Sequence, residues 1–541
     1  MAFTFFHGYM PKVFEAQIDA GLFRENDGIR FCQSIDIDEN LKFNNLAKVG
    51  GDLYNFVREN NCPMYIDRLQ GGCFFEGYDY DMKLIRTYRE MLGEKFFGFQ
   101  MHEWMSNFVS DTRKLIKGNC PEPWTEKSII ETIKTEYDYE HVFTEAMSPA
   151  ELAETGHIKD IYVYLDAMKH LLDKRQKYTG GKVLPCDSCM LGFPLEFRMG
   201  AERIMPEIGH QTGYSSIQLA YARGSAKAYG KSFGSYYEPW GGDPFSACNY
   251  HKDSLNEWNI SQESFPFHTA GGNGGSSRSL QRRIMLYSYL SGAEFFSEEW
   301  GAYNTFRDTE DFELTPYGEI KRDFIRFTEK YPDTGKPLTP VAAVIPKEIT
   351  FLDNIDLDAD KWGSFRPSPY ISSLLKNMRD GLKYLYRGSE CFGNENGNML
   401  NSILPDAFDI VNEDCFDGSK YEYAVNLTGK DDIEKKCRCT ELRDISRLLD
   451  GILPCKVTGG LHHIINKNEK GKYYLTVFNN TGIIRSVEKG EIKMKEAEKT
   501  VFVQIKDGRQ LTMLEGDSAI SADGDGYYVT VPAGGFFFGS F

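Results

Sequence analysis

The sequence predicts an α/β protein in which a (β/α)8 TIM barrel is followed by a small α/β domain and a C-terminal antiparallel β-sandwich. Residues 1–335 alternate short apolar runs with amphipathic stretches, the pattern of parallel strands joined by crossover helices. Eight such runs occur, and eight parallel strands close naturally into a barrel. From Lys456 onward, Asp-Gly and Gly-Asp turns separate short strands, which indicates an antiparallel β region.

The barrel elements follow in chain order. The predicted strands span residues 3–9, 28–37, 63–69, 96–104, 182–191, 203–210, 232–240 and 293–300. Amphipathic segments between them predict helices, for example over 41–60, 79–92, 217–229 and 280–290. Residues 107–180 form a long, mostly helical excursion after the fourth strand. Every later strand number depends on counting 3–9 as the first strand.

Three domains are expected. The barrel covers 1–335 and includes the excursion 107–180, an α/β (flavodoxin-like) domain covers 336–454, and the β-sandwich covers 455–541. Residues 331–340 are a turn-rich connector. The middle domain begins with a strand at 341–346 and continues with a helix over 370–386 and a strand at 408–412. The last domain has strands at 473–479, 500–505, 511–514 and 527–531.

Composition excludes several classes of function. A formal net charge of −17 disfavours nucleic acid or an anionic membrane as a partner. No run of about 20 apolar residues could span a bilayer. No basic segment followed by an apolar one opens the chain, so we expect a cytoplasmic protein. The 12 cysteines include Cys186-x-x-Cys189 and Cys437-x-Cys439, but no second pair at zinc spacing, so we expect buried free thiols, no metal and no cofactor.

Glutamates gather where the predicted barrel strands end, and catalytic side chains of such barrels lie at those ends. The relevant strand ends carry Gln100-Met101-His102-Glu103-Trp104, Pro206-Glu207-Ile208, Tyr237-Glu238-Pro239-Trp240 and Ser297-Glu298-Glu299-Trp300. Three of the six tryptophans therefore stand beside strand-end glutamates. A carboxyl group against an indole is partly desolvated, which raises its pKa and suits it to donate a proton.

Paired carboxyl groups beside aromatic rings predict glycosidic bond cleavage. One carboxyl group protonates the leaving oxygen while the other attacks carbon or activates water, and aromatic rings stack on the sugar. For Glu298 and Glu299 we expect one side chain in the cleft and one in a structural role, since successive strand residues face opposite ways.

These strand ends resemble those of the clan A glycoside hydrolases, which carry an acid/base glutamate after the fourth strand and a nucleophilic glutamate after the seventh. With 3–9 as the first strand, the resemblance implies that Glu103 is the acid/base and Glu238 the nucleophile of a retaining enzyme. Trp300 would match the clan's tryptophan near the eighth strand. The domain order is similar to that of the family 42 β-galactosidases, which favours a β-linked substrate.

The sequence departs from the clan at two positions. His102 stands where an asparagine usually precedes the acid/base glutamate, and the sixth strand offers Glu207 where a tyrosine often supports the nucleophile. If 3–9 were not a strand, every strand number would drop by one. Glu207 or Glu298 would then compete with Glu238 as the nucleophile.

Further side chains are candidates for holding the sugar. The predicted substrate-binding residues are His102, Trp104, Glu207, Trp240, Glu298, Glu299, Trp300, Asp67, Arg68 and Tyr237. Asp36, Asp38 and Asp187 could also bind sugar hydroxyls, and an ion pair that stiffens the rim is an equally good explanation for them. His7, His210 and His251 could point into the cleft, but a structural role is the commoner case for such histidines. Residues 271–278 are rich in glycine without the ending of a phosphate loop, so we expect a flexible loop over the barrel mouth, with Arg278 near an acidic group of the substrate.

Two other functions stay open. One is a metal-dependent barrel hydrolase, which requires a His-x-His motif near the first strand. The adjacent histidines of this sequence, His462 and His463, lie instead in the C-terminal β region. A carbohydrate-binding protein without activity would show the same aromatic and acidic residues. Whether the protein is a glycoside hydrolase or an inactive carbohydrate-binding protein, we expect it to bind a carbohydrate, and neither a nucleic acid nor a membrane. The sequence is also compatible with a homo-oligomer.

Overall fold

The computed structural model describes residues 3–32, 39–67, 69, 80–105, 169, 172–173, 175–187, 192–209, 215–238, 277–299, 305–306, 310–347, 369–387, 403–486 and 490–541. Most of the excursion predicted at 107–180 lies outside these ranges. So do residues 271–276 of the predicted loop over the barrel mouth.

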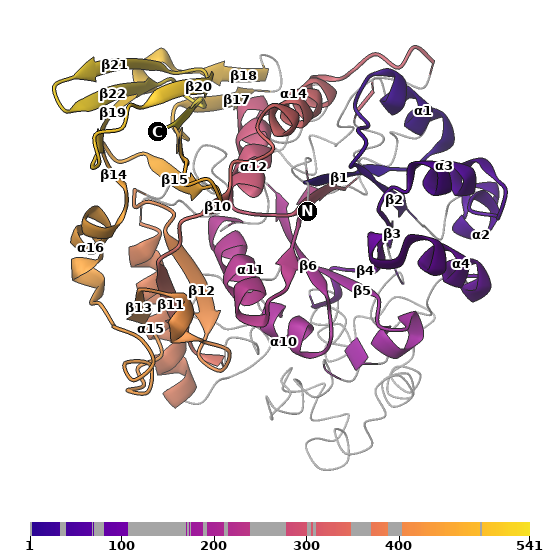
Figure 1. Ribbon diagram of the computed structural model, residues 1–541, viewed down its shortest axis with the longest axis horizontal. Helices are drawn as coiled ribbons and strands as arrows, with labels where there is room; N and C mark the ends of the chain where they lie inside the picture. Colours follow the sequence, from indigo (N-terminus) through magenta and orange to yellow (C-terminus); the bar gives the residue numbers. More distant parts are fainter. Residues whose placement is uncertain are drawn as a thin grey trace.

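Eight parallel strands close into a barrel at the centre of the molecule (Figure 1). Each strand hydrogen-bonds to its two neighbours in the ring, and the pairing of β5 with β6 completes the closure. In ring order the strands are β1 (Thr4–Gly8), β2 (Gly28–Cys32), β3 (Met64–Asp67), β4 (Phe96–His102), β5 (Val183–Asp187), β6 (Arg203–Gly209), β8 (Ser235–Glu238) and β9 (Phe295–Glu298). The predicted fold class is confirmed.

The first predicted strand is real, and it decides the strand count. β1 pairs in parallel with β2 on one side and with β9 on the other, so the barrel cannot close without it. The predicted seventh strand is divided, because Gly234 separates β7 (Ser232–Phe233) from β8. A Cβ atom at Gly234 would lie only 2.3 Å from the ring of Phe295, so no larger residue fits there. β8 is therefore the seventh barrel strand and β9 the eighth.

Helices surround the strands (Figure 1). Those in the barrel part of the chain are α1 (Pro11–Asp19), α2 (Phe43–Leu46), α3 (Asp52–Asn60), α4 (Met82–Leu92), α10 (Phe193–Arg198), α11 (Ser215–Tyr229), α12 (Arg278–Leu290) and α14 (Pro316–Lys330), with the short 3-10 helices η1 (Glu39–Leu41) and η2 (Gly93–Lys95). The single helix predicted over 41–60 is divided into η1, α2 and α3. Gly50, with φ of +82°, interrupts it in a conformation that L-residues rarely adopt.

Side chains alternate between the inside of the barrel and the layer under the helices. The inside holds a small apolar cluster made of Phe6, Tyr65, Phe97, Leu184, Cys186, Met205, Tyr236 and Phe295. The other face of the same strands belongs to the large core shared with the helices, as Phe5, Phe99 and Tyr237 illustrate. Because the strand period is two, the neighbours of these residues can be assigned to the same two faces.

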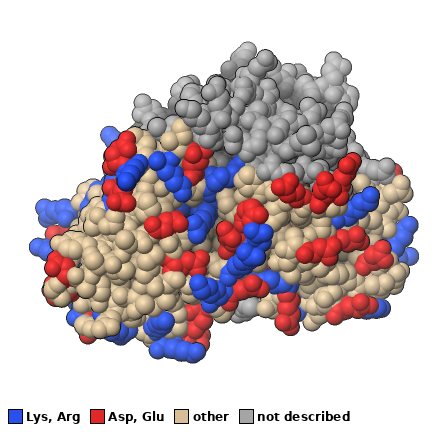
Figure 2. All heavy atoms as spheres, turned by 90° about the horizontal axis from the view of Figure 1, so that it is seen from above, with Lys and Arg blue, Asp and Glu red and all other residues tan. Residues whose placement is uncertain are grey.

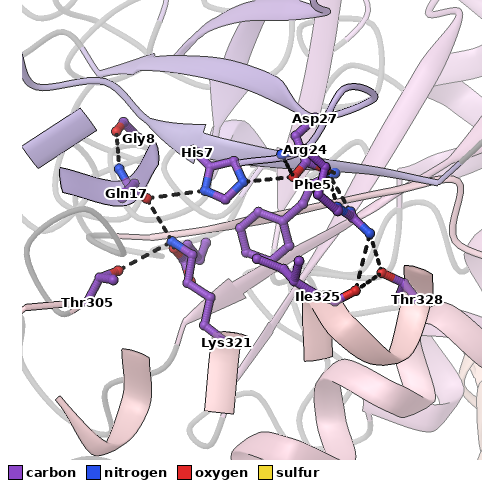
Figure 3. Close-up of polar contacts among 11 residues, drawn as sticks. Phe5, His7, Gly8, Gln17, Arg24, Asp27, Thr305, Lys321, Ile325 and Thr328 are labelled. Atoms are coloured by element: carbon purple, nitrogen blue, oxygen red, sulfur yellow. Dashed lines mark hydrogen bonds and ion pairs between the residues drawn. The ribbon is translucent and has the colours of Figure 1, made fainter. Parts of the chain in front are cut away.

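A buried polar network fixes β1 to the helix layer (Figure 3). His7 contacts Gln17 Oε1 at 3.2 Å through Nδ1 and Asp27 Oδ2 at 3.1 Å through Nε2. Asp27 also accepts hydrogen bonds from the backbone of Phe5 and from Arg24. Burial lowers the pKa of His7, and the hydrogen bond that His7 donates to Asp27 opposes this shift. His7 therefore faces α1 and not the cleft, which is the structural role expected as the commoner case for such a histidine.

A second α/β region packs on the barrel through α11. Its parallel sheet has the order β12 (Phe408–Asn412), β11 (Val341–Ile345), β13 (Tyr423–Asn426), and its helices are α15 (Pro369–Leu385) and α16 (Ile445–Ile452), with η5 (Gly418–Lys420) and η6 (Leu442–Asp444). Arg223 on α11 donates to Asp409 at 2.6 Å and to Asp406 at 3.3 Å. This buried ion pair joins the barrel to the region that follows it.

The C-terminal part of the chain forms antiparallel sheets. One has the order β10 (Lys336–Pro337), β15 (His462–Lys467), β16 (Tyr473–Phe478), β23 (Phe536–Ser540), β20 (Thr512–Gly516), and the other has the order β14 (Cys455–Thr458), β19 (Lys499–Ile505), β22 (Gly526–Val531), β21 (Ala519–Asp523). A hairpin of β17 (Ile483–Ser486) and β18 (Gly490–Lys493) and the 3-10 helix η7 (Lys495–Ala497) complete this part. β10 precedes the second region in sequence yet pairs with β15, so the chain from 336 contributes to the last sheets. A β-sandwich and the three domain boundaries stay predictions.

The distribution of surface charge and the character of the helices indicate which kinds of partner the described part of the protein can contact. On the face shown in Figure 2, acidic and basic side chains are interspersed over the described surface, so the net charge of −17 is not gathered in one region of that face. Among the described residues, no helix combines the length and apolar character needed to cross a bilayer.

Candidate active site

The strand-end residues divide between the two faces of the barrel wall. Asp67, two residues after the interior Tyr65, and Glu207, two residues after the interior Met205, belong to the inside. Glu298 and Tyr237 belong to the opposite face, under the helices. Proximity in the sequence to a strand end therefore does not by itself place a side chain in the site.

An arginine that sequence reasoning missed connects several strands inside the barrel. Arg30 on β2 pairs with Asp67 of β3, donates to the hydroxyl of Tyr236 at 2.8 Å, and donates to the backbone carbonyl of Glu298 at 2.5 Å. Its side chain is only 3% exposed, and the Tyr236 ring lies 5.2 Å from its guanidinium carbon. Asp67 is thus held at the floor of the site by an ion pair.

Glu103 stands directly after β4 in an unusual backbone conformation. Its φ of +45° lies in the left-handed region, which costs a residue with a side chain on the order of 1 kcal/mol or more. The Glu103 amide donates to the Cys186 carbonyl at 2.7 Å, which extends the pairing of β4 with β5 by one residue. Its side chain is 36% exposed, whereas that of Glu299 is 4% exposed. Strain of this kind concentrates at functional sites.

His102 lies between two carboxylates. Its Nε2 atom is 3.4 Å from Glu299 Oε1 and 3.8 Å from Glu103 Oε2. Its ring meets Tyr236 edge to face at 5.6 Å, and its Nδ1 atom is 3.4 Å from the amide nitrogen of Gln100. The residue that departs from the clan pattern is therefore held on several sides, next to the predicted acid/base glutamate.

His102 also belongs to a group of three side chains, all of residue types that bind metals, whose ligand atoms lie close together. One ligand atom from each of His102, Cys186 and Glu207 lies within 4.8 Å of the other two. Cys186 and Glu207 are buried and His102 is nearly so. Burial and the charge of Glu207 raise the pKa of the Cys186 thiol well above its ordinary value. Among the described residues this is the group with the composition of a metal site.

Glu298 has a structural ion pair. Its carboxylate accepts from Lys321 Nζ at 2.5 Å and from the hydroxyl of Tyr317, both on α14. Lys321 also donates to Gln17 of α1 at 3.0 Å (Figure 3), and both members of the pair are at most 1% exposed. Glu298 thus faces the helices while Glu299 approaches His102. This is the division that strand alternation predicts.

Trp104 is a core residue. It is 2% exposed, and its indole N–H donates to Glu196 Oε1 on α10 at 2.7 Å. Burial raises the pKa of Glu196 to about 8, against the opposing hydrogen bond from Trp104. The carboxyl group desolvated beside this indole is therefore Glu196 and not Glu103, which corrects the sequence-based pairing. Tyr237 is likewise buried in the outer core, where it contacts Phe296.

Several predicted residues are described in part or not at all. The backbone of Glu238 closes β8, with Gly209 as its partner on β6, and its side chain lies outside the described part. Arg68, Trp240, Trp300, Asp36, Asp38, His210 and His251 lie outside the described residues as well. Arg278 begins α12 and donates to Gln281 at 3.1 Å, and Asp187 accepts from the Met105 amide at 2.6 Å.

The sequence contained a signal for the missed interior residues. Arg30, Tyr65, Cys186, Tyr236 and Ser297 all stand at positions that alternate with outward apolar residues of their strands. A polar residue at an inward position of a buried strand requires a partner inside the barrel. The hydroxyls of Tyr65 and Ser297, for example, are 2.6 Å apart across the interior.

No protein-family model matches the sequence, and no curated protein matches it. Several solved glycoside hydrolase structures are similar over the whole length. An alpha-L-fucosidase isoenzyme 2 from Paenibacillus thiaminolyticus has a TM-score of 0.46 at 10% identity, with 100% of this chain and 99% of that chain covered. The catalytic module of a family 98 glycoside hydrolase from Streptococcus pneumoniae TIGR4 has a TM-score of 0.43 at 9% identity, with 100% and 98% covered.

A β-galactosidase from the Antarctic haloarchaeon Halorubrum lacusprofundi has a TM-score of 0.42 at 9% identity, with 99% of this chain and 98% of that chain covered. Similarities at this level carry no information on substrate or mechanism, because one barrel fold supports many unrelated reactions. The likeness to family 42 stays a prediction.

Proposed function

We propose that the protein is a glycoside hydrolase that cleaves a β-linked glycosidic bond with retention of configuration. The observation that carries the proposal is the strand count of the closed barrel. Glu103 follows the fourth barrel strand and Glu238 ends the seventh. These are the two positions at which the clan A enzymes, which the sequence resembles, carry the acid/base and the nucleophile.

The proposed reaction has two steps. Glu238 attacks the anomeric carbon while Glu103 donates a proton to the departing oxygen, so a glycosyl ester forms as the glycosidic bond breaks. Glu103 then removes a proton from a water molecule, which attacks the anomeric carbon and releases Glu238. The proton returns to Glu103, and the sugar leaves with its original configuration. This mechanism requires carboxyl groups about 5–5.5 Å apart.

The surroundings of Glu103 support this role. It is the partly exposed carboxylate of its cluster, where a substrate oxygen can reach it, and its strained backbone directs it away from a regular strand position. Glu299 and His102 stand next to it, and His102 takes the place of the clan's asparagine. In this proposal Glu299 and Asp67 supply polar contacts to the sugar hydroxyls, and His102 holds Glu299 in place.

The contacts of the competing glutamates also favour Glu238. Glu298 is engaged by Lys321 and Tyr317 on the helix side of the wall, so it cannot attack a sugar inside the barrel without leaving a buried ammonium unpaired. Glu207 lies inside the barrel and is fully buried next to Cys186. It is the remaining competitor.

The test is hydrolysis of a panel of aryl α- and β-glycosides by the purified protein, with the anomer of the first product identified by NMR. We expect one β-glycoside to be cleaved and the β-anomer to appear first. Appearance of the α-anomer from a β-glycoside would contradict retention. A protein that cleaves no member of the panel and no natural β-linked oligosaccharide would contradict the hydrolase proposal itself.

A further inference from the structure

Three consecutive barrel strands bring together a histidine, a cysteine and a glutamate. His102 ends β4, Cys186 lies on β5, and the two are direct partners in the register of these strands. Cys186 is also the partner of Met205 on β6, and Glu207 follows Met205 by two residues. Alternation then places Glu207 on the same inner face as Cys186. The approach of these side chains is thus a consequence of the barrel's own hydrogen bonding.

We propose that His102, Cys186 and Glu207 bind a divalent cation of the zinc type inside the barrel. Their ligand atoms lie within 4.8 Å of one another. An ion at the centre of a triangle with sides of that length would be about 2.8 Å from each atom. Zinc bonds of about 2.0–2.3 Å are reached when each ligand moves inward by roughly 0.5–0.8 Å, which rotation about side-chain torsions can supply.

The chemistry of the three ligands selects the kind of ion. Thiolate and imidazole bind borderline and soft cations such as Zn²⁺, whereas Mg²⁺ and Ca²⁺ prefer sets of oxygen ligands. Three protein ligands are the number found in zinc sites that keep one position for water or another ligand. A dication would also balance a thiolate and a carboxylate, both buried where uncompensated charge is costly.

The surroundings of His102 are those of a metal-bound imidazole. Such histidines usually direct their second nitrogen to a carboxylate, which fixes the ring and its tautomer. Here Glu299 approaches Nε2 at 3.4 Å. Gln100 contacts both Nδ1 of His102 and the thiol of Cys186, so Nδ1 is the nitrogen on the side of the cluster. We therefore assign Nδ1 to the metal and Nε2 to Glu299.

This site goes beyond the proposed hydrolase, and no step of glycosidic cleavage is assigned to the ion. Its place is the floor beneath Glu103, where it would tie β4, β5 and β6 together. The sequence shows no local sign of this site, because close pairs such as Cys186-x-x-Cys189 have no second pair at zinc spacing and no His-x-His stands near the first strand. The three ligands are far apart in the chain, and only the closed barrel brings them together.

The experiment uses the full-length protein after treatment with a chelator, titrated with Co²⁺. Cobalt is the probe because it absorbs visible light and a thiolate ligand adds a charge-transfer band in the near ultraviolet. We expect one Co²⁺ per chain, the thiolate band, and displacement of Co²⁺ by Zn²⁺. Cys186→Ser should abolish the band, and Glu207→Gln should weaken binding by about tenfold or more. Cys455→Ser, which changes a buried cysteine of β14, should leave both unchanged.

X-ray absorption of the zinc-loaded wild-type protein gives a test that needs no variant. We expect one sulfur among otherwise nitrogen and oxygen ligands. Failure of the wild type to take up one equivalent of either ion, a ligand set without sulfur, or a thiolate band that persists in Cys186→Ser would overturn the proposal. These results are independent of hydrolysis, so failure of the metal site and failure of the hydrolase proposal can be told apart.

Discussion

The indole N–H of Trp104 donates to Glu196 Oε1 at 2.7 Å, and this hydrogen bond lies in the core between the end of β4 and α10. The pair shows a carboxyl group desolvated against an indole, as the sequence suggested for this tryptophan. The carboxyl group, however, comes from a residue 92 positions further along the chain. It therefore stabilises the fold behind the site and does not belong to the site's chemistry.

Glu196 makes stability depend on pH. Its pKa is raised from an ordinary value of 4.5 to about 8 in the folded protein, so the folded state holds a proton that the unfolded state releases. The contribution of Glu196 to the free energy of unfolding is therefore fully present below about pH 4.5. It falls as the pH rises above that value and is lost once the pH has passed through about 8. We expect Glu196→Gln to remove this loss, so that its stability relative to wild type rises by a few kcal/mol between pH 5 and pH 8.

Urea denaturation across that pH range measures the effect. The control is Glu434→Gln, which changes an exposed glutamate and should follow the wild-type pH profile. A stability difference between wild type and Glu196→Gln that does not change with pH would show that Glu196 is not protonated in the fold.

The pair of Glu298 and Lys321 predicts a strong coupling. Lys321→Met should destabilise the protein by about 3–5 kcal/mol, because it leaves a carboxylate buried against α14 without its cation. The double variant with Glu298→Gln should recover much of that loss, since no buried charge then remains unpaired. A double-mutant cycle on the free energy of unfolding measures the coupling, and additive effects of the two changes would contradict it.

The contact of α11 with the second α/β region predicts another cost. Arg223 is buried, and nearby Asp406 and Asp409 raise its pKa above the ordinary value against the effect of burial. Arg223→Met should therefore cost about 3–5 kcal/mol, because two buried carboxylates lose their partner. Thermal unfolding compares it with Arg443→Met, which changes an arginine that is 85% exposed and should have almost no effect. Equal effects of the two would refute the role of this ion pair.

More of the fold than of the candidate site could be predicted from the sequence. Alternating apolar runs predicted the eight barrel strands, because parallel strands buried on both faces leave a strong hydrophobic signal. The ends of β6 and β9 agree with prediction to within two residues. The helix expected over 41–60 is divided at Gly50, since one glycine with positive φ overrides the amphipathic pattern around it.

The site was harder to predict, because it depends on which face each strand-end residue occupies. Glu298 and Glu299 are adjacent in sequence, but Glu298 is bound by α14 and Glu299 approaches His102. Arg30 was missed because its partners Asp67 and Tyr236 come from other strands. Contacts across a closed barrel join residues far apart in the chain, and no local pattern contains them.

Glu103 makes a prediction that separates an acid catalyst from a residue that only binds. Glu103→Gln should slow the cleavage of a glycoside with a poor leaving group by about 10²–10⁴-fold. An aryl glycoside whose phenol is a strong acid should be slowed less in the glycosylation step, because its oxygen leaves without protonation. Steady-state and burst kinetics on such a pair of substrates measure this difference. Equal losses for both would contradict the assignment of Glu103 as the proton donor.

The central claim is that Glu238 at the end of the seventh barrel strand is the nucleophile, and the most direct measurement is the rate of Glu238→Ala on the best β-glycoside of the panel. Glu207→Gln, and Glu94→Gln at an exposed glutamate of η2, serve as comparisons under the same conditions. We predict that Glu238→Ala loses a factor on the order of 10⁴ or more in kcat, while Glu94→Gln keeps wild-type activity. Near-normal activity of a folded Glu238→Ala variant would contradict the claim, and loss of the same size in Glu207→Gln alone would move the nucleophile to β6.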